Sequence, residues 1–385
     1  MKRSSRPRRE HAGVRRWLSE PPGADVKRAL ARLERTDDLL ALAVMPDVHV
    51  AGRVCNGVAL ATRELVYPEA VGADIGCGMT AAAFDCDADW LTREPAARAI
   101  LAKLRTIAPV LRHRSLRDAP THTSAPPPEQ LSASRLVSAA RREGRIELGT
   151  LGRGNHFLEF QADADNRLWI MLHSGSRAMG QIITQRHLKN GVRTRGGLLS
   201  LEARSLAGQD YLADVAWAVA YARASRRLMI ERVGELLRAR FGVRLVERSF
   251  VDCTHNTVDA ERHFGERLWV HRKGANAAAL GEPGLIPGSM GTRSFHVEGR
   301  GCAESLRSSS HGAGRALTRV QARRRIRAES LREQLADVWI DERIAASLCE
   351  EAPAAYKDID AVMRAQKRLV RIVRRLRPVL CYKGV

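Results

Sequence analysis

Aromatic residues, lysine and long apolar runs are all scarce in this sequence. Aromatic side chains make up only 5% of the 385 residues, so smaller apolar side chains must supply most of the packing of a core. No apolar run reaches the length of a membrane-spanning helix. Residues 1–16 are rich in arginine and lack the apolar segment of a signal peptide. These absences argue against a membrane protein and predict a soluble, cytoplasmic one without a membrane partner.

Two further absences concern cysteine spacing and nucleotide-binding motifs. The seven cysteines are odd in number, and no two of them have the Cys-x-x-Cys spacing of zinc or redox sites. In a chain of this length, that pattern is typical of a reduced protein in which one or two thiols are kept for chemistry. The sequence also lacks the GxxxxGK[ST] phosphate loop and a GxGxxG motif after a strand, which excludes two common nucleotide-binding arrangements.

What the sequence does contain is positive charge. Lys and Arg number 64 against 43 for Asp and Glu, which gives a formal net charge of +21, and almost all of the basic residues are arginine. Such a balance favours a polyanionic partner, because neutralising phosphates releases their counterions. A high arginine content also reflects the base composition of some genomes, so charge alone favours nucleic acid without establishing it.

The apolar pattern predicts an α+β protein. Short apolar runs at 39–45, 79–84 and 167–173 are typical of buried strands, whereas the spacing over 209–241 indicates one or two long amphipathic helices. Residues 244–302 suggest strands and loops, and residues 319–377 suggest basic helices. Prolines make 108–133 an irregular excursion. Because helical and strand segments come in blocks, we expect one large domain over 17–385, with central β-sheets and flanking helices, after a basic, mobile tail over 1–16.

Several metal-binding residue types follow apolar runs in glycine-rich loops. Asp74 and Cys77 lie three residues apart among glycines that let the backbone turn tightly, and His156, His173 and His255 occupy similar loops. Each alone has an ordinary structural explanation, as a hydrogen-bonded histidine, a small buried thiol or a turn-forming carboxylate. Together they form a plausible set for a two-metal site bridged by a thiolate, which suits phosphoryl transfer. Ligand softness leaves Zn, Fe, Co and Mn open.

These fragments and others resemble, in the same order, the motifs of the RtcB family of GTP-dependent RNA ligases. The resemblance extends from about residue 44 to the end of the chain. It rests on Asp47-Val-His49, Asp74 to Met79, Gly149 to His156, His173 to Arg177, His255-Asn256, His271 to Ala275, Gly288 to Thr292, His311 to Arg315, Glu351 to Asp358 and Lys383-Gly384.

The resemblance implies two Mn²⁺ ions, GTP and a catalytic histidine. Asp74, Cys77 and His156 would hold one metal, and Cys77, His173 and His255 the other. His311 would be the nucleophile that carries GMP covalently. The nucleotide pocket implied by the family comprises Asn155, Glu159, Ser289, His311, Gly312, Ala313, Gly314, Tyr356 and Lys383. Arg177 and Arg319 would meet phosphates of the RNA or the nucleotide.

The same resemblance implies an RNA substrate with a 3′-phosphate or 2′,3′-cyclic phosphate end and a 5′-hydroxyl end. GMP would pass from His311 to the 3′-phosphate, and the 5′-hydroxyl would then attack the activated end. An accessory activator protein is compatible with this scheme. An active-site cleft holding two metals is therefore part of the predicted fold.

Two other functions fit part of the pattern. A metal-dependent RNA-end phosphodiesterase or phosphatase would use the same metals but would not need His311, Tyr356 or Lys383. A non-catalytic, basic RNA-binding scaffold would explain the charge but not a complete Asp, Cys and His set. Lysine-nucleophile ligases carry a Lys-x-Asp-Gly signature, which Lys357-Asp-Ile-Asp360 does not match. Cys55 and residues 108–133 lie outside any motif of the family, and we assign them no role.

Overall fold

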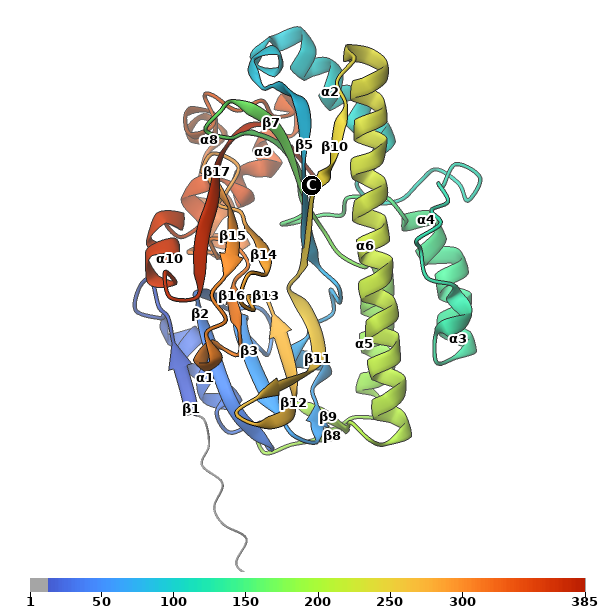
Figure 1. The fold of residues 1–385 in the computed structure, drawn as a ribbon, viewed down its shortest axis with the longest axis vertical. Helices are drawn as coiled ribbons and strands as arrows, with labels where there is room; N and C mark the ends of the chain where they lie inside the picture. Colours follow the sequence, from blue (N-terminus) through green and yellow to red (C-terminus); the bar gives the residue numbers. More distant parts are fainter. Residues whose placement is uncertain (1–12, 385) are drawn as a thin grey trace, which may run out of the picture.

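A computed structural model describes residues 13–384 and shows a mixed α+β architecture built on two larger sheets (Figure 1). The seven-stranded sheet has the order β10 (Leu245–Thr254), β5 (Gly78–Asp87), β7 (Arg167–Ser174), β6 (Phe157–Ala162), β17 (Val370–Lys383), β15 (Ser294–Gly299) and β14 (Pro283–Ile286). The five-stranded sheet has the order β1 (Gly13–Arg16), β2 (Leu39–His49), β3 (Asn56–Thr62), β12 (Glu266–Lys273) and β11 (Asn256–His263).

Two smaller sheets and ten α-helices complete the described part of the chain. The smaller sheets are β13 (Ala275–Ala277) with β16 (Ser308–Ser310), and β4 (Leu65–Val66), β9 (Leu199–Glu202) and β8 (Val192–Arg193). The helices are α1 (Ala24–Leu33), α2 (Glu94–Ile107), α3 (Ser134–Ala139), α4 (Arg145–Glu147), α5 (Ala178–Leu188), α6 (Leu206–Phe241), α7 (Arg319–Arg325), α8 (Ala328–Gln334), α9 (Ala345–Leu348) and α10 (Ile359–Ala365). None of the helices within 13–384 is long and apolar enough to cross a membrane.

Strand β5 shows why a mainly apolar run forms an interior strand of the larger sheet. Its alternate side chains point to opposite faces, as the pleat of a strand requires. Ala82 and Phe84 join the core shared with α2 and α6, whereas Met79, Ala81 and Ala83 join a second core on the other face. Both faces are therefore buried, and the one polar residue within 79–84, Thr80, is hydrogen-bonded to Asp252. The strands predicted at 39–45, 79–84 and 167–173 are confirmed as parts of β2, β5 and β7.

The predicted helical segment at 209–241 is one helix, α6, of 36 residues, which corresponds to about 54 Å at the usual rise per residue. The Ser205 side chain accepts a hydrogen bond from the Gly208 amide at its start, and Gly242 ends it in a left-handed conformation with φ of 71°. The helix runs along the longest axis of the molecule (Figure 1). It packs on the core face of the seven-stranded sheet through residues such as Met229 and Val233.

Two boundary predictions need correction. Residues 370–377, expected to be helical, belong to β17, in which Arg371, Val373, Arg375 and Arg377 are exposed between more buried neighbours. This alternation has the period of a strand, and β17 pairs on both sides, with β15 and β6.

Gly13–Arg16 pairs in parallel with β2 as strand β1, so these four residues are part of the fold and not of a tail. The rest of the predicted tail lies outside the described residues.

Candidate active site

Adjacent strands of the seven-stranded sheet bring the predicted metal ligands to one edge. Cys77 immediately precedes β5, His156 immediately precedes β6, His173 is near the end of β7, and His255 follows β10. The strand register places Met79 and Phe157 opposite His173 on its two sides, and Thr254 opposite Gly78. The ligands are far apart in sequence, and the pairing of β10, β5, β7 and β6 brings them together.

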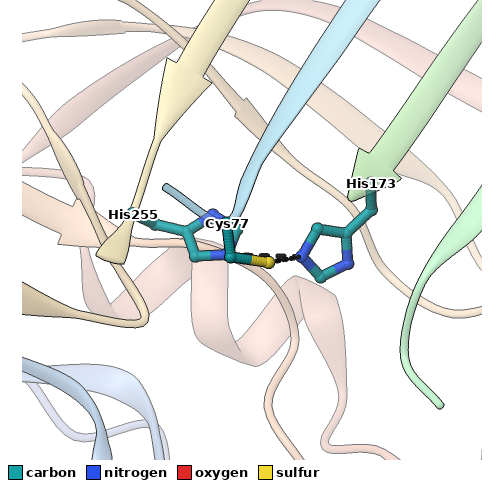
Figure 2. Close-up of side chains that lie close together, drawn as sticks. All are labelled: Cys77, His173 and His255. Carbon is teal, nitrogen blue, oxygen red and sulfur yellow. Dashed lines mark hydrogen bonds between the residues drawn. The ribbon is translucent and has the colours of Figure 1, made fainter. Parts of the chain in front are cut away.

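Cys77, His173 and His255 form the first group of donor atoms (Figure 2). The Cys77 Sγ atom lies 3.1 Å from His173 Nε2, and the two histidine Nε2 atoms lie 3.3 Å apart. All three side chains are buried, and one donor atom from each lies within 4.8 Å of the others. These three donor atoms are close enough to contact the same ion, so the group is a candidate for holding one cation.

Asp74, Cys77 and His156 form a second group that shares the thiol. The Cys77 Sγ atom lies 3.4 Å from His156 Nε2, which in turn lies 3.0 Å from Asp74 Oδ2. The two groups are those predicted from the family resemblance. A shared sulfur between two sets of donors is the arrangement expected if a thiolate bridges two cations.

The electrostatic surroundings of these donors fit metal binding. Burial lowers the pKa of His173 and of His255 well below its ordinary value, so both rings are neutral and keep a lone pair. His173 Nδ1 lies 3.2 Å from the Asn155 carbonyl, which directs its Nε2 lone pair at the cluster. Burial, and then Asp74, raise the pKa of the Cys77 thiol well above its usual value. A cation would offset this effect, because metal binding favours the thiolate.

Close packing at Gly175 shows how tightly the second group is held. A Cβ atom at Gly175 would lie 2.0 Å from Asp74 Oδ1, so any side chain there would displace the carboxylate. Two residues later, Arg177 has a φ of 57°, a backbone conformation that non-glycine residues rarely adopt. Backbone strain of this kind is found at sites whose geometry is imposed by their surroundings.

A cleft of about 730 Å³ lies beside the metal-ligand cluster, and all of the residues predicted to contact the nucleotide line it. Those residues are Asn155, Glu159, Ser289, His311, Gly312, Ala313, Gly314, Tyr356 and Lys383. His173 and Arg319 line it as well. Asp74, Cys77, His156, His255 and Arg177 do not reach the surface of the cleft.

His311 is held by a buried carboxylate that the sequence analysis did not assign. The Asp47 side chain is fully buried, and its Oδ2 lies 2.7 Å from His311 Nδ1 and 3.1 Å from the His311 amide nitrogen. With a carboxylate as its partner, Nδ1 is the nitrogen that donates the hydrogen bond, so the lone pair of the neutral ring is on Nε2. The His311 and His255 ring centroids are 4.7 Å apart, so this imidazole stands next to the metal-ligand cluster.

Gly314 permits this arrangement. Its φ is 76°, and a Cβ atom there would lie 2.2 Å from the Asp47 carbonyl oxygen. Only glycine combines that backbone conformation with so close an approach to the segment that holds His311. The glycines after His311 thus keep the loop against the end of β2, where Asp47 lies.

A second buried carboxylate, Glu351, organises another part of the cleft lining. Its Oε2 accepts hydrogen bonds from Lys383 Nζ at 2.9 Å and from the Tyr356 hydroxyl, and its Oε1 accepts one from Arg315 at 2.9 Å. Burial lowers the pKa of Lys383, but the charge of Glu351 outweighs this and raises it, so the ammonium group is retained. Lys383 thus presents a fixed positive charge to the cleft.

Glu159 differs from Glu351 because none of the basic side chains within residues 13–384 forms an ion pair with it. It is buried, and its Oε1 accepts a hydrogen bond from the Gln161 side chain at 2.6 Å. Burial raises the pKa of the Glu159 carboxyl to about 8. Near neutral pH this wall of the cleft therefore presents a largely protonated carboxyl group, which is a hydrogen-bond donor as well as an acceptor.

The two predicted phosphate-binding arginines flank the loop that carries Asn155. Arg177 Nη1 lies 3.5 Å from His156 Nδ1, and a Cβ atom at Gly152 would lie 2.3 Å from Arg177. Arg319 packs on Gly154, whose Cβ would lie 2.6 Å from its guanidinium. The Arg319 side chain is 44% exposed, which leaves it accessible to an anion at the mouth of the cleft.

Comparison with known proteins agrees with the motifs. A family model described as tRNA-splicing ligase RtcB matches residues 30–131 and 122–384. The chain is 36% identical to the RNA-splicing ligase RtcB of Escherichia coli (strain K12), with 97% of this chain and 98% of that protein aligned. It is 31% identical to an RNA-splicing ligase RtcB2 of another E. coli strain, over 88% and 87% of the two chains. It is 34% identical to the tRNA-splicing ligase RtcB of Pyrobaculum aerophilum, over 65% and 62%. The chain belongs to the RtcB family of RNA-splicing ligases.

Proposed function

We propose that this protein joins RNA 3′-phosphate or 2′,3′-cyclic phosphate ends to 5′-hydroxyl ends, using GTP, two Mn²⁺ ions and a covalent His311–GMP intermediate. The observation that supports this most strongly is the position of His311. Its imidazole lies between the metal-ligand cluster and the nucleotide-sized cleft, with Nδ1 engaged by Asp47. A nucleophile, its orienting carboxylate and a metal site are thus assembled in one place.

In the first step, His311 Nε2 attacks the α-phosphorus of GTP. A nitrogen–phosphorus bond forms, the bond to the β-phosphate oxygen breaks, and pyrophosphate leaves. Asp47 keeps the Nδ1 proton in place and stabilises the positive charge that develops on the ring. Lys383 also lines the cleft, where its positive charge favours an anionic phosphate.

In the second step, an oxygen of the RNA 3′-phosphate attacks the phosphorus of the His311-bound GMP, and the nitrogen–phosphorus bond breaks. His311 returns to its neutral form. The 5′-hydroxyl oxygen of the other RNA end then attacks the 3′-phosphate, GMP leaves, and the hydroxyl proton passes to solvent. A cyclic phosphate end is first opened by water to the 3′-phosphate.

The metals would be held by Asp74, Cys77 and His156 and by Cys77, His173 and His255. When bound, they supply Lewis acidity that withdraws charge from phosphate oxygens. Imidazole, thiolate and carboxylate donors also suit Zn, Fe and Co, so the choice of Mn²⁺ rests on the family resemblance. The free state of all seven cysteines is compatible with the reducing cytoplasm, where we place the reaction.

The cleft favours a ligase over a hydrolase. A metal-dependent phosphodiesterase or phosphatase would not need the His311 imidazole that Asp47 orients, nor Tyr356 and Lys383 held at Glu351. The decisive experiment offers the purified protein two RNA pairs of one sequence, one with 3′-phosphate and 5′-hydroxyl ends and one with 3′-hydroxyl and 5′-phosphate ends. We expect joined product from the first pair only, and only with GTP and Mn²⁺. Release of phosphate without joining would instead indicate the hydrolase, and binding without any reaction the scaffold.

A further inference from the structure

Arg226, in the middle of α6, is buried beneath the metal-ligand cluster. Its side chain is 0% exposed, and it is among the largest fully buried side chains of the described residues. Helix α6 lies along the face of the sheet whose strand ends carry the ligands (Figure 1). A guanidinium in this position must satisfy its donors inside the protein, because an unpaired buried charge is very costly.

The hydrogen bonds of Arg226 go to the three segments that carry the ligands of one predicted metal. Its Nη1 donates to the Gly76 carbonyl at 2.8 Å and to the Ser174 carbonyl at 3.0 Å. Its Nε and Nη2 donate to the two carboxylate oxygens of Asp252, each at 2.9 Å. Nε also lies 3.1 Å from Thr80 Oγ1.

Each of these three acceptor residues lies close in sequence to one of the predicted ligands. Gly76 directly precedes Cys77, Ser174 directly follows His173, and Asp252 lies three residues before His255 on β10. One planar group therefore joins the backbone just before β5, the backbone at the end of β7 and a side chain of β10, each within three residues of a predicted ligand. Its fixed fork geometry sets both the spacing and the angle of the groups it joins.

Stability alone is a poor reason for this arrangement. A buried ion pair contributes little net free energy of folding, because desolvating both charges offsets their attraction. Two of the acceptors are, moreover, backbone carbonyls and not Asp252. The packing is also close, since a Cβ atom at Gly78 would lie 3.0 Å from the Arg226 guanidinium carbon. The geometry of the ligand loops is the feature that these contacts determine.

We infer that Arg226 is a positioning residue for the metal centre, holding Cys77, His173 and His255 at the separation that a bound cation requires. The inference rests on the proposed metal centre. This positioning acts on metal affinity, and it does not require Arg226 to touch a substrate.

The test measures metal affinity directly in the full-length apoprotein. Co²⁺ serves as the probe, because the absorbance of a thiolate–cobalt bond reports coordination by Cys77 without any enzymatic turnover. Arg226→Lys keeps the charge but loses the fork, and we expect its Co²⁺ dissociation constant to rise by about 10- to 100-fold, the range typical for residues that orient metal ligands. The Mn²⁺ concentration for half-maximal ligation should rise in parallel, with a smaller change in the rate at saturating Mn²⁺.

Arg272→Lys is the matched control. Arg272 is equally buried on β12, but it bonds to Ser308, Leu306 and Glu261, none of which adjoins a predicted ligand. We expect Arg272→Lys to lower thermal stability while its Co²⁺ affinity stays within about twofold of the wild type, since it leaves the ligand loops in place.

Asp252→Asn provides a second variant should Arg226→Lys fail to fold. It keeps the bonds of Arg226 to Gly76 and Ser174 but loosens the guanidinium, so we expect a smaller loss of Co²⁺ affinity in the same direction. Wild-type affinity in every soluble variant of Arg226 and Asp252 would overturn the inference. Failure of the wild type itself to bind Co²⁺ or Mn²⁺ would instead overturn the proposed metal centre, and the inference with it.

Discussion

The cluster of predicted metal ligands and the cleft proposed to bind the nucleotide are neighbours, but they are built in different ways. The ligands of the cluster lie at the ends of paired strands in one sheet, so strand register determines their spacing. The cleft is lined by loops and strand ends from both larger sheets and from the C-terminal part of the chain. The cluster should therefore respond to substitution in an all-or-none way, because one misplaced ligand disturbs a shared geometry. The cleft should respond in a graded way, residue by residue.

The largest effect is expected at Cys77, the one ligand common to both metal groups. Cys77→Ser replaces a soft, bridging thiolate by a hydroxyl, so both metals should be lost and protein-bound GMP should fall by about 1,000-fold or more. Metal content measured by mass spectrometry, together with label from GTP, checks this. Cys86→Ser is the control, because Cys86 lies near the other end of β5. Retention of both metals by Cys77→Ser would contradict the expectation that the cluster responds to substitution as one unit.

A smaller effect is expected at Asp47, which orients His311 but belongs to neither metal group. Asp47→Asn keeps the shape of the side chain but no longer stabilises a charged imidazole, so GMP transfer to His311 should slow by about 100-fold or more. Co²⁺ affinity should remain at the wild-type value. If this variant lost metal as Cys77→Ser does, the cluster and the cleft would not be separable units.

Glu159 gives a pH test of the cleft wall. The pKa of its carboxyl is raised to about 8 in the folded protein from an ordinary value of 4.5, so the unfolded state loses this proton first as pH rises. The wild type should therefore lose stability relative to Glu159→Gln between about pH 4.5 and pH 8. Above that range the difference should stay constant at roughly 5 kcal/mol, because each pH unit between the two pKa values corresponds to about 1.4 kcal/mol. Urea unfolding of the two apoproteins at pH 4, 6 and 9 measures the difference in their free energies of unfolding. If that difference were the same at all three pH values, burial would not raise the pKa of Glu159.

The smallest effect is expected at Arg319, on the exposed rim of the cleft. Arg319→Ala should weaken binding of a 3′-phosphorylated RNA only a few-fold, and the slope of log affinity against log salt should fall by about 0.7 for a single phosphate contact. Formation of protein-bound GMP should change little. Arg98→Ala, at an exposed position on α2, serves as the control. Equal salt slopes for wild type and Arg319→Ala would remove Arg319 from the RNA path.

The candidate metal donors could be selected from the sequence because they are marked by residue type and local pattern. Asp74, Cys77 and the three histidines stand in glycine-rich loops next to apolar runs, and that signal is contained in a few consecutive residues. The helix at 209–241 and the strand at 79–84 likewise follow from local periodicity. The family motifs added which residues belong together, which spacing alone left open.

What the sequence did not predict depends on contacts between distant segments. Asp47 and His311 are separated by 264 positions, and Arg226 contacts Gly76 across 150. No local pattern reports such pairs, although Asp47 and Glu351 each begin a segment that matches a family motif. The error at 370–377 has a different cause. Its arginines fit the polar face of a helix as well as the exposed face of a strand, and pairing with β6 and β15 decides between them.

The most direct test of the account is to detect GMP on His311. The protein is incubated with Mn²⁺ and α-labelled GTP, denatured, and digested so that mass spectrometry locates the label, with His311→Ala and the control His122→Ala treated in the same way. His122 lies outside the cleft and pairs with Glu231. We predict acid-labile label on His311 in the wild type and in His122→Ala, and none in His311→Ala. Absence of label in a wild-type protein that has bound its metals, or label on another residue, would contradict the central claim.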